Sequence, residues 1–430
     1  MLFEKSKHHQ QRLSEFQAVI LAGYGSSNRL YPISEEDNLP KALLPVGNKP
    51  IISYTLEWLE KAGIHEAIVV ANAQQKLSAY LRGYTGNVHC TVATVDEDIG
   101  TAEALRAIKD KIDRDFIVIP CDLITELNPR DLLDAHRVYD PTFTALFYEP
   151  GSTEAPSKDD ESLPYVGIDT TQNALVYMAQ RSEDEDFSMR MSLLKKFPRV
   201  RIHTDLQDAH FYIFKRWVID IVADKENVES ISEDLIPLLV KCQYQRKLVE
   251  RENIEKYSSS YHYLFANALS LSTTQSIGIN DSFSKDPIQP DFNSPIKSYV
   301  HVYRGGFCGR GNTIASYNEL NRYVTKQGAN IMRQPATAEI APRTQVGNDS
   351  VVGEYTKIDE RSSVKKSCVG AHCVIGKNLN SVKIDGCIIC NHAKILDKAS
   401  LKDCEVAGGY TVDKESQLKG EKLVSFREAI

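Results

Sequence analysis

A glycine-rich loop and two basic side chains follow the first apolar run of the chain. The run Ala18–Ala22 leads into Gly23 and Gly25, and Arg29 and then Lys41 come after them. Glycines let backbone amides approach a phosphate closely, and cationic side chains offset the negative charge of phosphoryl groups. A strand, a glycine turn, an arginine and a lysine in this order predict a nucleotide-binding site.

The segments that must position these residues alternate between predicted strands and predicted helices. Apolar runs typical of strands lie at 18–22, 67–71, 88–95, 116–120 and 143–148. Apolar residues at helical spacing lie between them, over 51–62, 101–112 and 132–139. This alternation predicts a mostly parallel sheet with helices on both faces. Ligands of such sheets bind beyond the carboxyl ends of the strands, where the Gly23 loop and Asp122 fall.

A different period governs the C-terminal part. Aliphatic residues recur every six positions, with occasional one-residue slips, at Ile340, Val346, Val352, Ile358, Val364, Val369 and Ile375, and again from Ile389 to Val412. One aliphatic residue in six predicts a left-handed parallel β-helix, in which three such repeats form one coil. The ends of such a solenoid expose unpaired backbone, so we expect a cap or a partner there.

Composition narrows the classes of function. The chain has 430 residues, 42% hydrophobic and 25% charged, which is typical of a soluble globular protein of two or three domains. Its net charge of -7 argues against mainly electrostatic binding of nucleic acid or of an anionic membrane. The polar start, residues 1–11, and the lack of a long apolar run predict a cytosolic protein.

The nine cysteines are scattered along the chain, which in a cytosolic protein predicts buried free thiols. Cys387 and Cys390 have the spacing of half a zinc site, but no second pair stands at ligand spacing, so we assign no metal.

Together the glycine loop, the Pro40-Lys41 pair and the six-residue period resemble the sugar-nucleotide pyrophosphorylase family. The resemblance implies a nucleotidyltransferase-like domain that joins a sugar 1-phosphate to a nucleoside triphosphate, with magnesium held by two acids. It implies that Asp122 matches the first magnesium ligand and Asp234, less closely, the second. It also implies that the Gly100-Thr101 turn touches the base and opens a helix. The residues that it assigns to the nucleotide site are Gly23, Gly25, Arg29, Lys41, Gly100, Thr101, Asp122 and Asp234.

The loop departs from the family pattern in three ways. Tyr24 replaces a glycine and places a ring where phosphate would approach, and one extra residue separates Gly23 from Arg29. The acidic run 35–37 adds three carboxylates that would repel a triphosphate, unless it is an exposed turn that points away. We therefore predict a vestigial site with no catalytic residue and no required cofactor. Binding of GTP or a sugar nucleotide there stays open.

Segments over nearly the whole chain resemble one branch of this superfamily more specifically, the pyrophosphorylase-like subunits of the factor that reloads translation initiation factor 2 with GTP. The resemblance implies a non-catalytic structural and regulatory subunit. It also implies pairing with an epsilon subunit of similar two-domain build, assembly with the remaining subunits, and no direct contact with nucleic acid or membrane. These segments are 45–50, 121–125, 197–204, 208–212, 234–237, 318–322 and 368–370.

Domain boundaries follow from these observations. We predict a nucleotidyltransferase-like domain over 1–330 with flexible segments at 150–164 and 270–298, a left-handed β-helix over 331–415 and a tail over 416–430. The epsilon subunit carries a helical exchange domain after its solenoid, and we expect no room for one in this tail.

Two alternatives use the same residues differently. An active sugar-1-phosphate nucleotidyltransferase of the GDP-mannose pyrophosphorylase type would need an intact loop. A nucleotide-sensing module would bind GTP or a sugar nucleotide without turnover through Lys41, Asp122 and the Gly100-Thr101 turn. We expect His203 and His210 to be structural, and Gly309-Arg310-Gly311 to form a turn between domains.

Overall fold

The computed structural model describes residues 15–23, 29–34, 39–72, 75–96, 99–150, 163–180, 188–258, 294–327, 334–376 and 381–424. Tyr24 and Gly25, the acidic run 35–37 and most of the two segments predicted to be flexible lie outside these ranges. No helix within the described ranges is long and apolar enough to cross a membrane.

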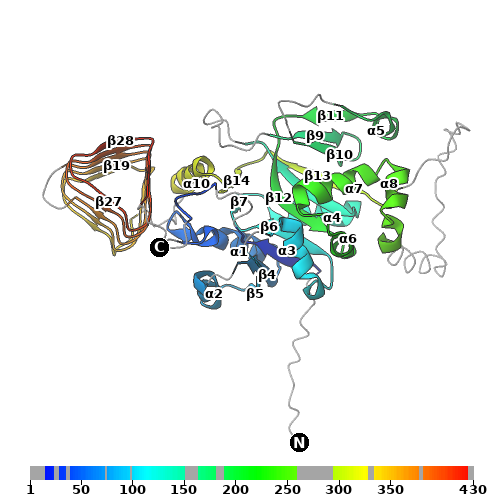
Figure 1. The fold of residues 1–430 in the computed structure, drawn as a ribbon, viewed down its shortest axis with the longest axis horizontal. Coiled ribbons are helices and arrows are strands. Elements are labelled where there is room, and N and C mark those ends of the chain that lie inside the picture. The colour runs from blue at the N-terminus through cyan, green and yellow to red at the C-terminus, as the bar shows by residue number, and fades with distance from the viewer. Residues whose placement is uncertain are drawn as a thin grey trace, which may run out of the picture.

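A seven-stranded sheet forms the centre of the N-terminal part, as Figure 1 shows. Its strand order is β13-β8-β12-β6-β1-β4-β5, and only β12 runs antiparallel to its two neighbours. The mostly parallel sheet is therefore confirmed. The strands are β1 (Gln17–Leu21), β4 (Glu66–Ala71), β5 (His89–Thr94), β6 (Phe116–Pro120), β8 (Phe143–Tyr148), β12 (Gln207–Phe214) and β13 (Ser298–Tyr303).

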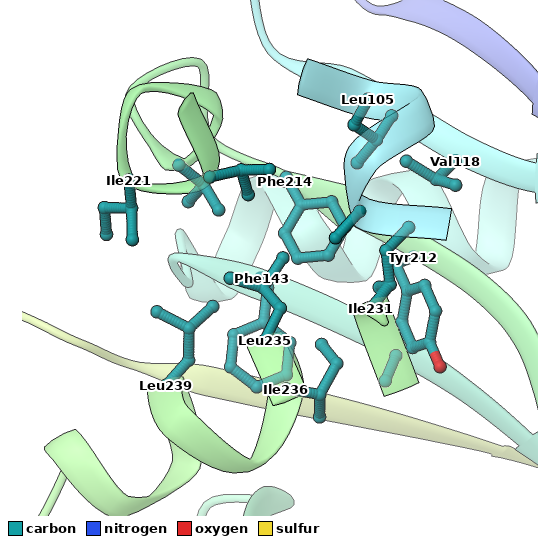
Figure 2. Close-up of a cluster of buried hydrophobic side chains, with 14 of the residues drawn as sticks. Leu105, Val118, Phe143, Tyr212, Phe214, Ile221, Ile231, Leu235, Ile236 and Leu239 are labelled. Carbon is teal, nitrogen blue, oxygen red and sulfur yellow. The ribbon is translucent and has the colours of Figure 1, made fainter. Parts of the chain in front are cut away.

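Helices cover both faces of the sheet, because the strands are apolar on both sides. Figure 2 shows the core on one face, where Val118, Phe143 and Phe214 meet side chains of the covering helices. The helices on this face are α3 (Thr101–Ala107), α6 (Val218–Asp224), α7 (Ile236–Cys242) and α8 (Arg246–Arg251), with a turn of π-helix over Ile231–Leu235. The other face packs against α1 (Ile51–Lys61), α2 (Gln75–Arg82) and α4 (Pro129–Tyr139).

Smaller elements extend this domain. An antiparallel sheet of β9 (Tyr165–Asp169), β10 (Ala174–Ala179) and β11 (Val200–His203) lies next to α5 (Met191–Lys196) in Figure 1. The described residues 39–50 form a 3-10 turn (Lys41–Leu43) and the short strands β2 (Pro45–Val46) and β3 (Lys49–Pro50).

The expectation of a turn at Gly309-Arg310-Gly311 is wrong at its first two residues. Residues Cys308–Arg310 form β14, which pairs antiparallel with β7 (Leu123–Thr125) directly after the central strand β6. The pairing registers Arg310 with Leu123, and the Gly311 amide donates to the Asp122 carbonyl oxygen over 3.0 Å. A stretch near the end of the domain is thereby held at the carboxyl end of β6.

In the described parts of residues 334–424, fifteen short strands form a parallel β-helix of three five-stranded sheets, which confirms the solenoid. Ile340 pairs with Ile358, eighteen residues later, so one coil is three six-residue repeats long. Ile358 pairs with Ile375 and Ile395 with Val412 at steps of seventeen residues, which account for the one-residue slips in the period, whereas Ile375 pairs with Ile395 at a step of twenty. The left-handed sense stays a prediction.

The strands of the β-helix are distributed among its three sheets as follows. One sheet holds β15 (Glu339–Ile340), β18 (Lys357–Ile358), β21 (Val374–Ile375), β24 (Lys394–Ile395) and β27 (Thr411–Val412). A second holds β16 (Gln345–Val346), β19 (Ser363–Lys365), β22 (Lys383–Asp385), β25 (Ser400–Lys402) and β28 (Gln417–Lys419). The third holds β17 (Val351–Val352), β20 (Cys368–Val369), β23 (Ile388–Ile389), β26 (Glu405–Val406) and β29 (Lys422–Leu423). The stack thus continues past residue 415, and the domain boundaries stay predictions.

An apolar seam joins the β-helix to the N-terminal domain. Ile388 of the third sheet and Cys390, which directly follows strand β23, pack in one buried cluster with Leu44, Val46 and residues of α10 (Ile314–Gln327). The Asn48 side chain donates to the Val352 carbonyl oxygen across this seam over 2.8 Å.

Candidate functional site

A cavity of about 430 Å³ opens at the carboxyl ends of β1, β4 and β6. It lies where the strand pattern predicts a ligand, because parallel strands point their carboxyl ends to one edge of a sheet. Six of the eight residues assigned to the nucleotide site contribute to its wall: Gly23, Arg29, Lys41, Gly100, Thr101 and Asp122. Gly25 lies outside the described residues, and Asp234 is not part of the wall.

Asp122 contributes to the wall of this cavity and is fully buried between two cations. Its Oδ2 atom is 2.7 Å from the Lys41 Nζ atom, and its Oδ1 atom is 3.4 Å from the Arg310 Nε atom. The side chains of Lys41 and Arg310 are themselves only 11% and 10% exposed. Water therefore screens neither ion pair strongly, and all three groups depend on one another for charge balance.

Burial alone would raise the pKa of the Asp122 carboxyl group, because a charged form is disfavoured away from water. Arg310 and Lys41 outweigh burial and hold this pKa well below its usual range. Asp122 is therefore an anion at neutral pH, and the two cations are its counter-charges.

Arg310 is the residue of the site that the sequence analysis missed. It follows Asp122 by 188 positions, and it reaches the cavity only because β14 pairs with β7. A three-residue strand has no period that could be recognised. The flanking Gly309 and Gly311 were the available signal, and they were interpreted as a turn.

The Gly100-Thr101 turn opens helix α3 as expected, but residues 229–231 of the chain pack against it. The Thr101 hydroxyl oxygen accepts from the Ile231 amide over 2.9 Å, and the Ala102 amide donates to the Glu229 carbonyl oxygen over 2.8 Å. A Cβ atom on Gly100 would come within 2.3 Å of that same oxygen. Glycine is thus required here by the close approach of residues 229–231, which also line the cavity.

Asp234 has a structural contact instead of a place in the cavity. Its Oδ2 atom accepts from the backbone amides of Glu229 and Ser230, over 3.0 and 2.8 Å. These bonds hold the segment that packs on Gly100. Of the two acids that the resemblance assigns to magnesium, one is thus paired with two cations and the other is bonded to backbone amides.

The residues present therefore do not fit a magnesium site built on two acids. A magnesium ion needs carboxylate oxygens free to coordinate it, whereas both Asp122 oxygens already face a cation. Among the described residues, no group of three or more His, Cys, Asp or Glu side chains could hold a metal. All nine cysteines, including Cys387 and Cys390, are free thiols.

His210 lines the cavity as an uncharged group. It lies in a bulge of β12 with a positive φ of 51°, and its amide donates to the Asp208 Oδ1 atom over 2.8 Å. The Tyr212 hydroxyl donates to the other Asp208 oxygen. Burial, followed by the charge of Arg310, lowers the pKa of His210 well below its usual value. His203 lies at the end of β11, outside the cavity wall.

The chain is similar to known proteins of one superfamily. The nucleotidyl transferase family model matches residues 17–158. The chain is 37% identical to translation initiation factor eIF2B subunit gamma of Schizosaccharomyces pombe, over 96% of this chain and 91% of that protein.

Two relatives match about half of the chain. Translation initiation factor eIF2B subunit epsilon of Dictyostelium discoideum is 28% identical over 51% of this chain and 32% of its own length. Mannose-1-phosphate guanyltransferase of Saccharomyces cerevisiae is 27% identical over 52% of this chain and 55% of that protein. Of these three relatives, only the eIF2B gamma subunit of Schizosaccharomyces pombe matches nearly the whole chain, which includes both the α/β domain and the β-helix. The chain therefore belongs to the family of translation initiation factor eIF2B gamma subunits.

Proposed function

We propose that the chain is a non-catalytic subunit of the guanine-nucleotide exchange factor for translation initiation factor 2, acting in the cytosol. The observation that carries the proposal is family membership over both parts of the chain. The geometry at Asp122 supports the non-catalytic role, because the acid available for metal chemistry is neutralised by Lys41 and Arg310.

The role is one of placement. The α/β domain and the β-helix are joined by a buried seam, so they offer partners one continuous scaffold. The chain pairs with the epsilon subunit, whose Dictyostelium discoideum form is similar to it over 51% of this chain, and with the remaining subunits of the factor. Together they hold initiation factor 2 while the exchange domain of the epsilon subunit releases GDP.

Reconstitution of the exchange factor with and without this chain tests the proposal. We expect GDP release from labelled initiation factor 2 to slow when the chain is left out and to recover when the wild-type chain is added. An exchange rate that does not depend on the presence of the chain would contradict the proposal.

The half-length similarity to a guanyltransferase favours one second candidate, an active sugar-1-phosphate nucleotidyltransferase. This activity would require Asp122 to leave both ion pairs before it could hold a metal ion. Binding of GTP or a sugar nucleotide without turnover needs no such step, and the cavity has the volume and the lining cations for an anionic ligand.

A further inference from the structure

One sheet of the β-helix differs from the other two in its charge. It is the sheet of β16, β19, β22, β25 and β28, the upper face of the solenoid in Figure 1, where β19 and β28 are labelled. Four exposed lysines on its strands form what we call the lysine face: Lys365, Lys383, Lys402 and Lys419.

The register of the coils places these lysines close together. Asp385 pairs with Lys365 on one side and with Lys402 on the other, and Lys402 pairs with Lys419. Neighbouring strands lie about 4.8 Å apart, so this column of charges spans roughly 15 Å. Lys383 lies in the adjacent column. Asp385 is the single acid on the strands of this sheet, which leaves four positive charges against one negative charge.

The rest of the sheet surface is small and polar. The column that contains Lys383 otherwise presents Gln345, Ser363, Ser400 and Gln417. No arginine and no aromatic residue occurs on these strands. The four ammonium groups therefore stand on a flat surface that an extended or helical segment could approach along its whole length.

The other two sheets of the solenoid show that this charge is not a general property of it. The third sheet packs on the N-terminal domain through Ile388 and Cys390. On the first sheet, Lys357 forms an ion pair with Glu339 over 2.8 Å. Within the described part of the chain, by contrast, none of the four lysines of the lysine face has an ion pair with a carboxylate.

We propose that the lysine face binds an acidic segment of a partner protein. A row of unpaired ammonium groups is complementary in charge to a row of carboxylates. An acidic segment that binds to the face would place its carboxylates close to the lysine side chains, and the opposite charges would attract each other. Nucleic acid fits less well, because the face lacks the aromatic and arginine side chains that stack on bases, and the whole chain carries a net charge of -7. The proposal goes beyond the exchange function and does not depend on it.

Binding of a fluorescein-labelled glutamate-rich peptide to the full chain, followed by fluorescence polarisation at low salt, tests the proposal. Replacing all four lysines of the face by glutamine should weaken binding by about ten-fold or more, because most of the favourable charge contacts are lost. Arginine at the same four positions should keep the affinity within a few-fold. The side chains point outward, so unchanged thermal unfolding would show that the variants fold.

A matched variant controls for the loss of four positive charges anywhere on the solenoid. Lys357→Gln, Lys394→Gln, Lys398→Gln and Lys414→Gln combined remove the same charge from the first sheet and from the turns that precede β25 and β28, and binding should stay within about two-fold of the wild type. Equal losses in the two variants, or no loss in the lysine-face variant, would overturn the proposal. Tighter binding of a labelled oligouridine than of the peptide through the same lysines would overturn it in favour of nucleic acid.

Discussion

At the scale of single residues, the site is defined by how Asp122 is balanced. Lys41 lies beside one oxygen of its carboxylate and Arg310 beside the other, and all three side chains are nearly or fully buried. A buried charge is costly unless it is paired, so each group holds the others in place. In this structure the three side chains act as counter-charges to one another in the wall of the cavity.

Because of this charge balance, we predict that a conservative substitution of Asp122 strongly destabilises the folded chain. Asp122→Asn removes the charge with little change in shape and leaves two mostly buried cations without a counter-charge. We expect the free energy of unfolding of the full chain to fall by about 3 kcal/mol, measured by urea denaturation at neutral pH. Because the folded pKa of Asp122 is depressed, this difference should persist at all pH values above its unfolded pKa of about 3.9 and shrink below it.

Asp134→Asn is the matched control. Asp134 forms an ion pair with Arg137 over 2.6 Å, but its side chain is 61% exposed. Water screens such a pair, so the loss should be under about 0.5 kcal/mol. Equal losses for the two variants would show that Asp122 is not held by buried charges.

His136 predicts how stability depends on pH. It is buried, its Nδ1 atom lies 2.8 Å from the Thr144 hydroxyl, and burial, with Lys215 acting in the same direction, lowers its pKa to about 3. The unfolded chain takes up the proton near pH 6.5, so stability should fall as the pH drops from there, by up to about 1.4 kcal/mol per pH unit. Urea denaturation between pH 7 and pH 4 should show a shallower slope for His136→Gln. Parallel slopes would contradict this assignment.

At the scale of elements, the start of α3 depends on one glycine. Gly100→Ala places a Cβ atom against the Glu229 carbonyl oxygen, which belongs to backbone and cannot rotate away. We expect a loss of about 2 kcal/mol in the free energy of unfolding, because the segment 229–231 must move. Gly83→Ala is the control, since its Cβ atom would lie 3.6 Å from its nearest contact, and it should leave stability nearly unchanged. A stable Gly100→Ala protein would show that the segment is not packed on α3.

The elements with a regular period were the predictable part of the molecule. Five of the seven strands of the central sheet, β1, β4, β5, β6 and β8, were predicted from continuous apolar runs, and the coils of the β-helix from an aliphatic residue at every sixth position. The cavity followed from the topology, since Asp122 and the Gly23 loop end neighbouring strands.

Contacts between distant segments were not predictable in the same way. Arg310 reaches Asp122 through a pairing of two three-residue strands, β14 and β7, and neither strand has a recognisable pattern. Asp234 has the residue type of a metal ligand, but the turn of π-helix after Ser230 directs it to backbone amides. The spacing of apolar residues predicts local secondary structure. These contacts instead depend on which distant segments the fold brings together.

At the scale of the whole molecule, the buried seam makes the α/β domain and the β-helix one unit. Ile388 faces outward from the solenoid but is only 3% exposed, because it packs on the N-terminal domain. Ile388→Ser should weaken the seam by about 2 kcal/mol and split thermal unfolding into two transitions, recorded by calorimetry. Val374→Ser, at the matching position of β21 on the first sheet, should keep the wild-type profile. A single transition in both variants would show that the contact of Ile388 with the N-terminal domain does not couple the two parts.

The central claim is that a nucleotidyltransferase-like fold acts here as a scaffold for nucleotide exchange without nucleotidyl transfer of its own. The most direct measurement is pyrophosphate release by the purified chain, alone and in the assembled exchange factor, with magnesium, GTP and mannose 1-phosphate. With Asp122 held between Lys41 and Arg310, we predict no release above the protein-free blank in either state. Release at the rate of an enzyme, lost in Asp122→Asn, would contradict the account.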